Sequence, residues 1–185
     1  MAEAASSGGQ LIYQTKHIVQ GEFGVSADPT IEFSTVLGSC VSVCLYDDVA
    51  KVGGLNHFLL PGKEESGPTR LVGGVHAMEL LINALLKAGA KRERFKAKLF
   101  GGARMMEGLS DIGLQNATFA KEFIAREKIE CLGESLGGTL ARRVKFVPTT
   151  GRVLQKLLGR PEDVPVAAAK PAPAKESEGG DLELL

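Results

Sequence analysis

Short apolar runs rich in β-branched and aromatic residues recur along the chain, and turn residues separate them. Runs of this length and composition predict β-strands. The runs occupy residues 17–25, 30–37, 40–47, 52–60, 95–100, 129–135, 142–148 and 152–158. Asp47-Asp48 ends one run and Thr149-Thr150-Gly151 separates the last two, so we expect two β-hairpins, over 40–60 and over 142–158.

Two longer segments have apolar residues at helical spacing. The first predicts a helix from about Thr69 to Lys87, with Thr69 as the N-cap and Gly89 as the C′ residue. Its predicted buried stripe consists of Ala77, Leu80, Leu81, Ala84 and Leu85. The second predicts a helix over 115–129 with Asn116 as a cap. Its apolar face contains Ala120, Phe123 and Ile124.

Seven or eight strands and two main helices, joined by tight turns, predict an α+β layered domain. In this arrangement a mixed β-sheet carries both helices on one side. A chain of 185 residues, 44% apolar and 24% charged, fits one such domain with tails. We expect residues 1–10 to be a disordered N-terminal tail, 11–161 to form the domain, and 162–185 to be a disordered acidic tail rich in Ala and Pro.

Charge and targeting signals narrow the classes of function. The chain has 22 basic and 22 acidic residues, so bulk electrostatics gives no case for nucleic-acid binding. The sequence shows neither a signal peptide nor an apolar run near the ~20 residues of a membrane helix. These features predict a cytoplasmic protein with reduced thiols and no membrane insertion.

Cofactor motifs are missing from the sequence. No GxGxxG segment and no Walker loop occurs. Cys40 and Cys44 would lie about 13 Å apart along an extended strand, too far to ligate one metal ion. His76 and Glu79 fit a surface pair on a helix better than a metal pair. We therefore expect no cofactor and no bound metal.

Cys40 is a candidate nucleophile. An apolar run ends at Leu37, and Gly38-Ser39 then turn the chain so that the cysteine opens the next run. A sulfur at such a strand edge lies close to free backbone N–H groups. Groups of this kind lower the pKa of a thiol and can also hold an oxyanion.

His57 is the candidate base. In the predicted hairpin, the start of one strand lies beside the end of the other, which brings His57 within side-chain reach of Cys40. A thiol beside an imidazole is the minimum for nucleophilic catalysis, and a third group commonly orients the imidazole. The candidates for this third group are the hydroxyls of Ser34 and Thr35 and the amide of Asn56.

A purely structural interpretation competes with this one. Cysteine often packs as a small hydrophobic residue, and a histidine in an apolar strand is often a hydrogen-bonded core residue. Cys44 and Cys131 lack the setting of Cys40, and we interpret both as packing residues. His17 and His76 have no nucleophile nearby in the sequence and are assigned structural or surface roles.

These residues lie in segments that resemble the CheD family, the chemoreceptor glutamine deamidases of bacterial and archaeal chemotaxis. The resemblance spans about residues 15–157. It rests, in order, on LGSCVSVCLYD, GGLNHFLLP, AKLFGGARMM, IGLQNATFAKEFI and ESLGGTLARRVKFVPTTGRVLQK. It implies a fold related to cysteine-dependent deamidating toxins and hydrolysis of selected glutamine side chains of methyl-accepting receptors to glutamate.

The resemblance also implies roles for individual residues. The nucleophilic Cys of the family matches Cys40, and its catalytic His matches His57. The third catalytic residue of the family is a Thr, and its position matches Ser34 here, with Thr35 beside it. Either hydroxyl can orient the imidazole. His57 would take the thiol proton, or the pair would already exist as thiolate and imidazolium, and the reaction would pass through a thioester.

Receptors are the implied protein substrate, and a CheC-type phosphatase is a further implied partner. A different possibility is a regulatory binding module for that phosphatase or for a receptor, with an inactive thiol site. Hydrolysis of receptor methyl esters is a third possibility, because the same thiol can attack an ester. The segment from Gly101 to Met106 is interpreted as a turn that ends a strand, followed by core methionines, with a role in lining the site or a partner surface as the alternative.

Overall fold

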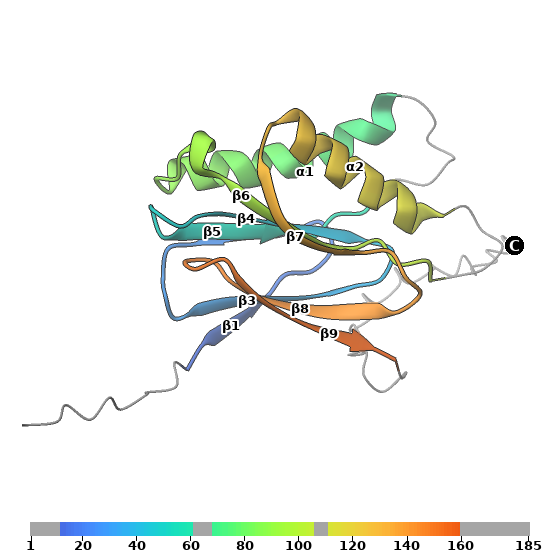
Figure 1. The fold of residues 1–185 in the computed structure, drawn as a ribbon, viewed down its shortest axis with the longest axis horizontal. Coiled ribbons are helices and arrows are strands. Elements are labelled where there is room, and N and C mark those ends of the chain that lie inside the picture. Colours follow the sequence, from blue (N-terminus) through green and yellow to red (C-terminus); the bar gives the residue numbers. More distant parts are fainter. Residues whose placement is uncertain (1–11, 61–67, 106–110, 160–185) are drawn as a thin grey trace, which may run out of the picture.

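Two β-sheets pack face to face, and two helices cover the outer side of one of them (Figure 1). The computed structural model describes residues 12–60, 68–105 and 111–159. The predicted boundaries of the two tails, at 10/11 and 161/162, lie outside these residues. The described chain has three layers: the helices, a five-stranded sheet and a four-stranded sheet.

The five-stranded sheet is the middle layer and has the strand order β2-β5-β4-β6-β7. Its members are β2 (Phe23–Ser26), β4 (Val41–Asp47), β5 (Val52–Asn56), β6 (Lys96–Gly101) and β7 (Glu130–Leu136). β6 and β7 run parallel, whereas the other neighbours are antiparallel. Parallel neighbours need a crossover connection, which the helix α2 (Ile112–Arg126) supplies.

The four-stranded sheet has the order β1-β3-β8-β9. It consists of β1 (Gln14–His17), β3 (Ile31–Leu37), β8 (Ala141–Val147) and β9 (Arg152–Leu158). β1 is parallel to β3, and the other pairs are antiparallel. Because β3 belongs to this sheet and β4 to the other, the short turn at 38–40 carries the chain from one layer to the next.

β4 is buried along its whole length because both of its faces are covered. Val43 and Leu45 belong to the core beneath the helices. Cys44 and Tyr46 belong to the core between the two sheets, together with Phe146 of β8. Because successive side chains of a strand point to opposite faces, β4 contributes to both apolar cores and separates them.

The predicted α+β class is confirmed, and so are the mixed strand pairing and the placement of both main helices on one side. The two predicted hairpins are also present, as β4–β5 and β8–β9. The expectation of one sheet with seven or eight strands is wrong, because the described residues form nine strands in two sheets. The predicted strand at 17–25 is interrupted by a turn at 19–22, and its two parts join different sheets.

Helix α1 (Pro68–Lys87) agrees closely with the predicted helix. Gly89 has a φ of +98°, as expected of a C′ residue, while the side chain of Thr69 lies outside the described residues. The predicted stripe is rotated, because the side chain of Leu80 is 40% exposed. The stripe that packs on the sheet contains Met78, Leu81, Ile82 and Leu85.

Helix α2 begins three residues before the predicted start. Asp111 is its N-cap, and the Asp111 carboxylate accepts a hydrogen bond of 2.8 Å from the amide of Leu114. Asn116 is therefore not a cap but a buried residue inside the helix. The predicted apolar face is confirmed, since Ala120, Phe123 and Ile124 are all buried.

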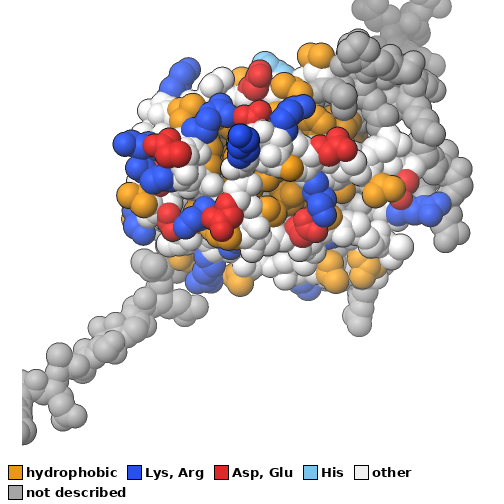
Figure 2. Space-filling model, turned by 45° about the horizontal axis from the view of Figure 1, so that its top comes forward, with side chains coloured by type: hydrophobic (Ala, Val, Ile, Leu, Met, Phe, Trp, Pro, Cys, Tyr) orange, Lys and Arg blue, Asp and Glu red, His pale blue; other side chains and the backbone are white. Residues whose placement is uncertain are grey.

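The outer face of the helical layer carries basic and acidic side chains in an interspersed pattern, with hydrophobic side chains between them (Figure 2). Ion pairs account for part of this pattern, including Arg92–Glu127 at 2.6 Å beside the short 3₁₀ helix Arg92–Arg94. Within the described ranges, no helix has the length and apolar character needed to cross a bilayer.

Candidate active site

Cys40 is the last residue of the turn that connects β3 in one sheet to β4 in the other. The turn is held by the segment that follows β6. The amide of Gly102 donates to the Cys40 carbonyl at 2.8 Å, and the amide of Ala103 donates to the Gly38 carbonyl at 2.8 Å. Gly101 has a φ of +112°, and a Cβ at this position would clash with the Cys40 carbonyl oxygen. A glycine is needed here, where two backbones approach closely.

His57 directly follows β5 and faces Cys40 across the hairpin. Val41 and Phe58 exchange both of their backbone hydrogen bonds, each 3.0 Å long. This register makes Cys40 and His57 diagonal neighbours, and such residues have Cβ atoms about 7 Å apart. Both residues border the space between the sheets, because Cys40 packs on the inter-sheet core and His57 contacts a side chain of β3. The predicted hairpin is present, and within the described chain the thiol of Cys40 donates to Gln20 and not to the Nε2 of His57.

Thr35 of β3 fixes the orientation of the His57 ring. Its hydroxyl donates to the carbonyl of Ile18 at 2.8 Å, and its Oγ1 lies 2.9 Å from His57 Nδ1. Because the only hydroxyl proton is used on Ile18, Thr35 Oγ1 must accept a proton from Nδ1–H. This assigns the neutral tautomer of His57, in which the lone pair is on Nε2. His57 is 7% exposed, and its Nε2 has no hydrogen-bond partner among the described residues.

The other two candidates for the orienting group lie elsewhere. Ser34 is adjacent to Thr35 on β3, and adjacent side chains of a strand point to opposite faces, so its hydroxyl points away from His57. The Asn56 side chain accepts a hydrogen bond from the amide of Val43 at 3.0 Å and donates to the carbonyl of Ala77 at 3.3 Å. Asn56 therefore ties the hairpin to α1.

A tight turn over Val19–Glu22 completes the site, and sequence analysis missed it. The amide of Glu22 donates to the Val19 carbonyl at 3.0 Å, and Gly21 has a φ of +87°, which together define a type II turn. The turn forms two backbone hydrogen bonds with His57. The amide of Gly21 donates to the His57 carbonyl at 2.8 Å, and the amide of His57 donates to the Glu22 carbonyl at 2.9 Å. At the remaining position of the turn, Gln20 Oε1 accepts a hydrogen bond of 3.3 Å from Cys40 Sγ.

Asn116 of α2 connects the segment that follows His57 to the turn that precedes Cys40. Its Oδ1 accepts a hydrogen bond of 2.7 Å from the amide of Leu60, three residues after His57. Its Nδ2 donates to the carbonyl of Ser39, the residue before Cys40, at 3.0 Å. One buried amide in α2 thus fixes the spacing between the segments that carry the thiol and the imidazole.

Burial shifts the pKa values of Cys40 and His57 in the directions that favour their neutral forms. It raises the pKa of the Cys40 thiol, although the backbone amide of Cys40 acts in the opposite direction. Burial also lowers the pKa of His57, opposed by the Ile18 carbonyl and by Glu22. Of the two protonation states that the sequence left open, the structure favours a neutral thiol beside a neutral imidazole.

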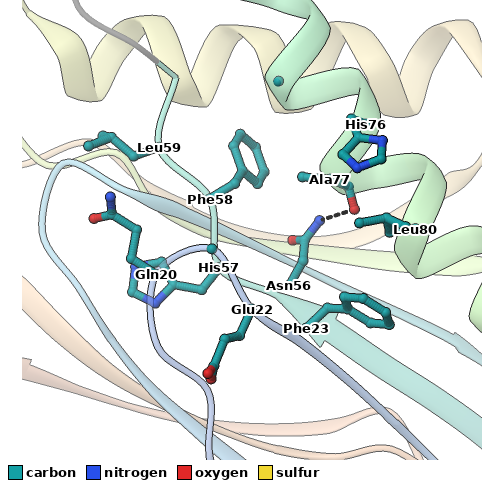
Figure 3. Close-up of a pocket in the computed structure, with 12 residues that line it drawn as sticks. Gln20, Glu22, Phe23, Asn56, His57, Phe58, Leu59, His76, Ala77 and Leu80 are labelled. Carbon is teal, nitrogen blue, oxygen red and sulfur yellow. Dashed lines mark hydrogen bonds between the residues drawn. The ribbon is translucent and has the colours of Figure 1, made fainter.

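A pocket of about 290 Å³ opens beside His57, between α1 and the segment that follows β5 (Figure 3). Gln20, His57 and Leu59 lie on one side of it, and His76 and Leu80 of α1 lie on the other. Cys40 is not part of its lining. Gln20 both lines this pocket and contacts the thiol.

The remaining residues that sequence analysis singled out lie in varied settings. Cys44 is fully buried, as expected of a packing residue, and burial raises its pKa to about 12. Cys131 is exposed, so the expectation that it packs in the core is wrong. His17 and His76 are exposed, in agreement with surface roles. In the part of the chain that the structure describes, no three His, Cys, Asp or Glu residues gather as a metal site would require.

The segment from Gly101 to Met106 ends β6 as predicted, but Met105 is not a core residue. Its side chain is 49% exposed and covers Gly38 in the turn that precedes Cys40. Met106 lies outside the described residues.

Comparison with known proteins gives consistent results. A family model described as CheD chemotactic sensory transduction matches residues 59–157, more than half of the chain. A probable chemoreceptor glutamine deamidase CheD of Caulobacter sp. (strain K31) is 48% identical over 173 residues, which cover 91% of this chain and 92% of that protein. A protein of the same name from Cereibacter sphaeroides (strain ATCC 17025 / ATH 2.4.3) is 47% identical over 89% of this chain and 83% of its own length.

Among solved structures, Neisseria meningitidis protein NMB0706 is similar to this chain with a TM-score of 0.48 and 12% sequence identity. The match covers 77% of this chain and 74% of that protein's chain. The relative from Caulobacter covers 91% of the chain, whereas the family model begins at residue 59. With this identity over nearly the whole length, the chain belongs to the CheD family.

Proposed function

We propose that the protein deamidates glutamine side chains of chemoreceptors, with Cys40 as the nucleophile, His57 as the base and Thr35 as the residue that orients His57. The observation that carries this proposal is the free Nε2 of His57, buried and unpaired among the described residues, on the face of the hairpin that carries Cys40. A buried histidine with a structural role would have both ring nitrogens satisfied.

The reaction begins with neutral partners. His57 Nε2 takes the proton from Cys40 Sγ as the sulfur attacks the amide carbon of the glutamine side chain. Thr35 keeps Nδ1 protonated through its 2.9 Å contact, so Nε2 remains the basic nitrogen throughout the cycle. Imidazolium then protonates the departing ammonia and leaves a thioester. Water, activated by the neutral His57, hydrolyses the thioester to glutamate and regenerates the thiol.

Negative charge develops on the amide oxygen during attack, and backbone amides near Cys40 are the groups available to stabilise it. The amide of Val41 is already committed to Phe58 at 3.0 Å. The amide of Cys40 itself interacts with the sulfur, so we assign it as a donor to the oxyanion. One such donor contributes about 3 kcal/mol to transition-state stabilisation in other enzymes.

The proposed substrate is a macromolecule that must bring one carboxamide to the Cys40 sulfur. The relatives that match this chain are named for chemoreceptors, and this name supports methyl-accepting receptors as the substrate. A CheC-type phosphatase is proposed as a second partner on the strength of family membership. Zero net charge and the interspersed charges on the helical face fit a protein partner better than a polyanion (Figure 2).

The test uses receptor cytoplasmic fragments incubated with the wild type, with Cys40→Ala and with His57→Gln. Mass spectrometry locates each conversion of glutamine to glutamate. We expect site-specific conversion by the wild type and none by either variant. Cys131→Ala removes the exposed cysteine instead and should retain full activity. Equal conversion by Cys40→Ala and the wild type would overturn the proposal and favour a binding module.

A further inference from the structure

Gln20 is the one pocket-lining residue for which the structure gives a hydrogen bond to Cys40 Sγ, within the described chain. Its Oε1 accepts the thiol proton at 3.3 Å, and the same side chain lines the pocket next to the ring of His57 (Figure 3). Its backbone is held by the type II turn, in which Gly21 and Glu22 are bonded to His57. The two residues after Gln20 are therefore hydrogen-bonded to the backbone of His57, which places the Gln20 side chain beside this histidine.

Because of this location, Gln20 lies next to any group that the Cys40 sulfur attacks. A carbon attacked by Cys40 Sγ must come within about 3–3.5 Å of the sulfur. Gln20 Oε1 already lies at a similar distance from that sulfur. The reacting carboxamide and the Gln20 carboxamide must therefore lie side by side in the Michaelis complex.

We propose that Gln20 determines specificity for a carboxamide, because its Oε1 accepts a hydrogen bond from the –NH₂ group of the substrate glutamine. In the free protein, this oxygen is occupied by the thiol proton. When that proton moves to His57, Oε1 loses its donor at the moment when the sulfur attacks. An N–H of the substrate is the group that can replace it, and the exchange conserves the number of hydrogen bonds.

The same contact distinguishes the substrate from related groups. A glutamate methyl ester has no N–H at the corresponding position, so it cannot make this hydrogen bond and Oε1 must take its donor from solvent. The glutamate product has only acceptors and repels Oε1, which favours its release. Gln20 thus selects amide over ester by a hydrogen bond that only the amide can make.

The experiment rests on the proposed function but separates the two claims. One receptor peptide carries its reactive glutamine, and a second carries glutamate γ-methyl ester at that position. The value of kcat/KM is measured for both peptides with the wild type, with Gln20→Leu, and with Gln155→Leu, which changes an exposed glutamine of the other sheet. Thermal unfolding monitors the fold of each variant.

We expect Gln20→Leu to lower the ratio of amide to ester kcat/KM about 5- to 10-fold, the effect of one neutral hydrogen bond. Gln155→Leu should leave the ratio unchanged. Gln20→Glu retains an acceptor oxygen, so it should preserve the preference for the amide, while both rates fall because its charge disfavours the thiolate. A ratio that is unchanged in Gln20→Leu would overturn the specificity claim alone. Conversion of either peptide by Cys40→Ala would instead overturn the proposed function.

Discussion

Thr35 Oγ1 lies 2.9 Å from His57 Nδ1, although Thr35 belongs to β3 of one sheet and His57 directly follows β5 of the other. The hydroxyl accepts from the ring and donates to Ile18, so it holds one tautomer of His57. Its neighbour Ser34 offers the same chemistry in the sequence but points to the opposite face of β3. Two adjacent hydroxyls therefore have unequal roles.

Replacing Thr35 with Val should lower kcat for receptor deamidation about 10- to 100-fold, as is common when the group that orients a reacting histidine is lost. KM should change little, because the hydroxyl does not touch the substrate. Thr35→Ser should retain most of the activity, and Ser34→Ala should remain close to the wild type. A larger loss in Ser34→Ala than in Thr35→Val would contradict the assignment.

The pH dependence of Cys40 alkylation should show that the thiol is protonated at rest. Burial raises the pKa of this acid, so the thiolate fraction stays below that of a free cysteine and grows only as the pH approaches the raised value. The rate with a small neutral alkylating reagent should therefore rise steadily from pH 6 to pH 9, without a plateau near neutrality. His57→Gln should leave this profile almost unchanged while it abolishes deamidation. A plateau below pH 7 that disappears in His57→Gln would show a preformed ion pair instead.

Asn116→Ala should reduce both stability and activity. The substitution leaves the buried amide of Leu60 without its acceptor, which costs about 2 kcal/mol. It also frees the Ser39 carbonyl and loosens the spacing between Cys40 and His57. Urea unfolding measures the first effect, and kcat of the folded protein measures the second. Glu122→Ala, on the exposed side of the same helix, is the matched control and should show neither effect.

The carboxylate of Asp47 at the end of β4 should matter for stability and not for chemistry. Burial would raise its pKa, but the Arg94 guanidinium and the amides of Ala50, Lys91 and Val49 lower it far below its ordinary range. Asp47→Asn should therefore lower the free energy of unfolding by about 3 kcal/mol, the typical cost of breaking a buried charge pair. The folded variant should deamidate receptors at the normal rate.

The adjacent Asp48 provides the comparison for this prediction. It pairs with Lys96 at 2.7 Å on the surface, where solvent screens the interaction. Asp48→Asn should therefore have a much smaller effect in the same urea unfolding experiment. Equal losses in the two variants would show that burial is not the source of the stabilisation at Asp47.

The sequence was sufficient to predict the hairpin, because antiparallel pairing across a short turn follows from local spacing. It could not separate Ser34 from Thr35, since β3 is largely buried on both faces and its pattern does not reveal which side faces the imidazole. The division into two sheets depends on pairs such as Ser34 with Lys145, which are far apart along the chain.

Polar residues with long-range contacts were the hardest to predict. Gln20 is an exposed residue in a turn, and its contact with Cys40 arises only when the turn folds over the hairpin. Asparagine is a common helix-capping residue, but its side-chain amide can equally well join two buried segments by hydrogen bonds, as Asn116 does. In both cases the side-chain chemistry was visible in the sequence, but its partner was not.

In the proposed mechanism the reacting groups come from both layers, so catalysis would be a property of the assembled sandwich. β3 contributes the hydroxyl, the hairpin of the middle layer contributes the imidazole, and the sulfur lies at the crossing between them. A chain that has formed its strands but not yet joined its layers holds only an ordinary thiol. On this mechanism, partly folded or heat-loosened molecules should be inert toward the amides of other proteins, and the capacity to modify a receptor should arise only when folding is complete.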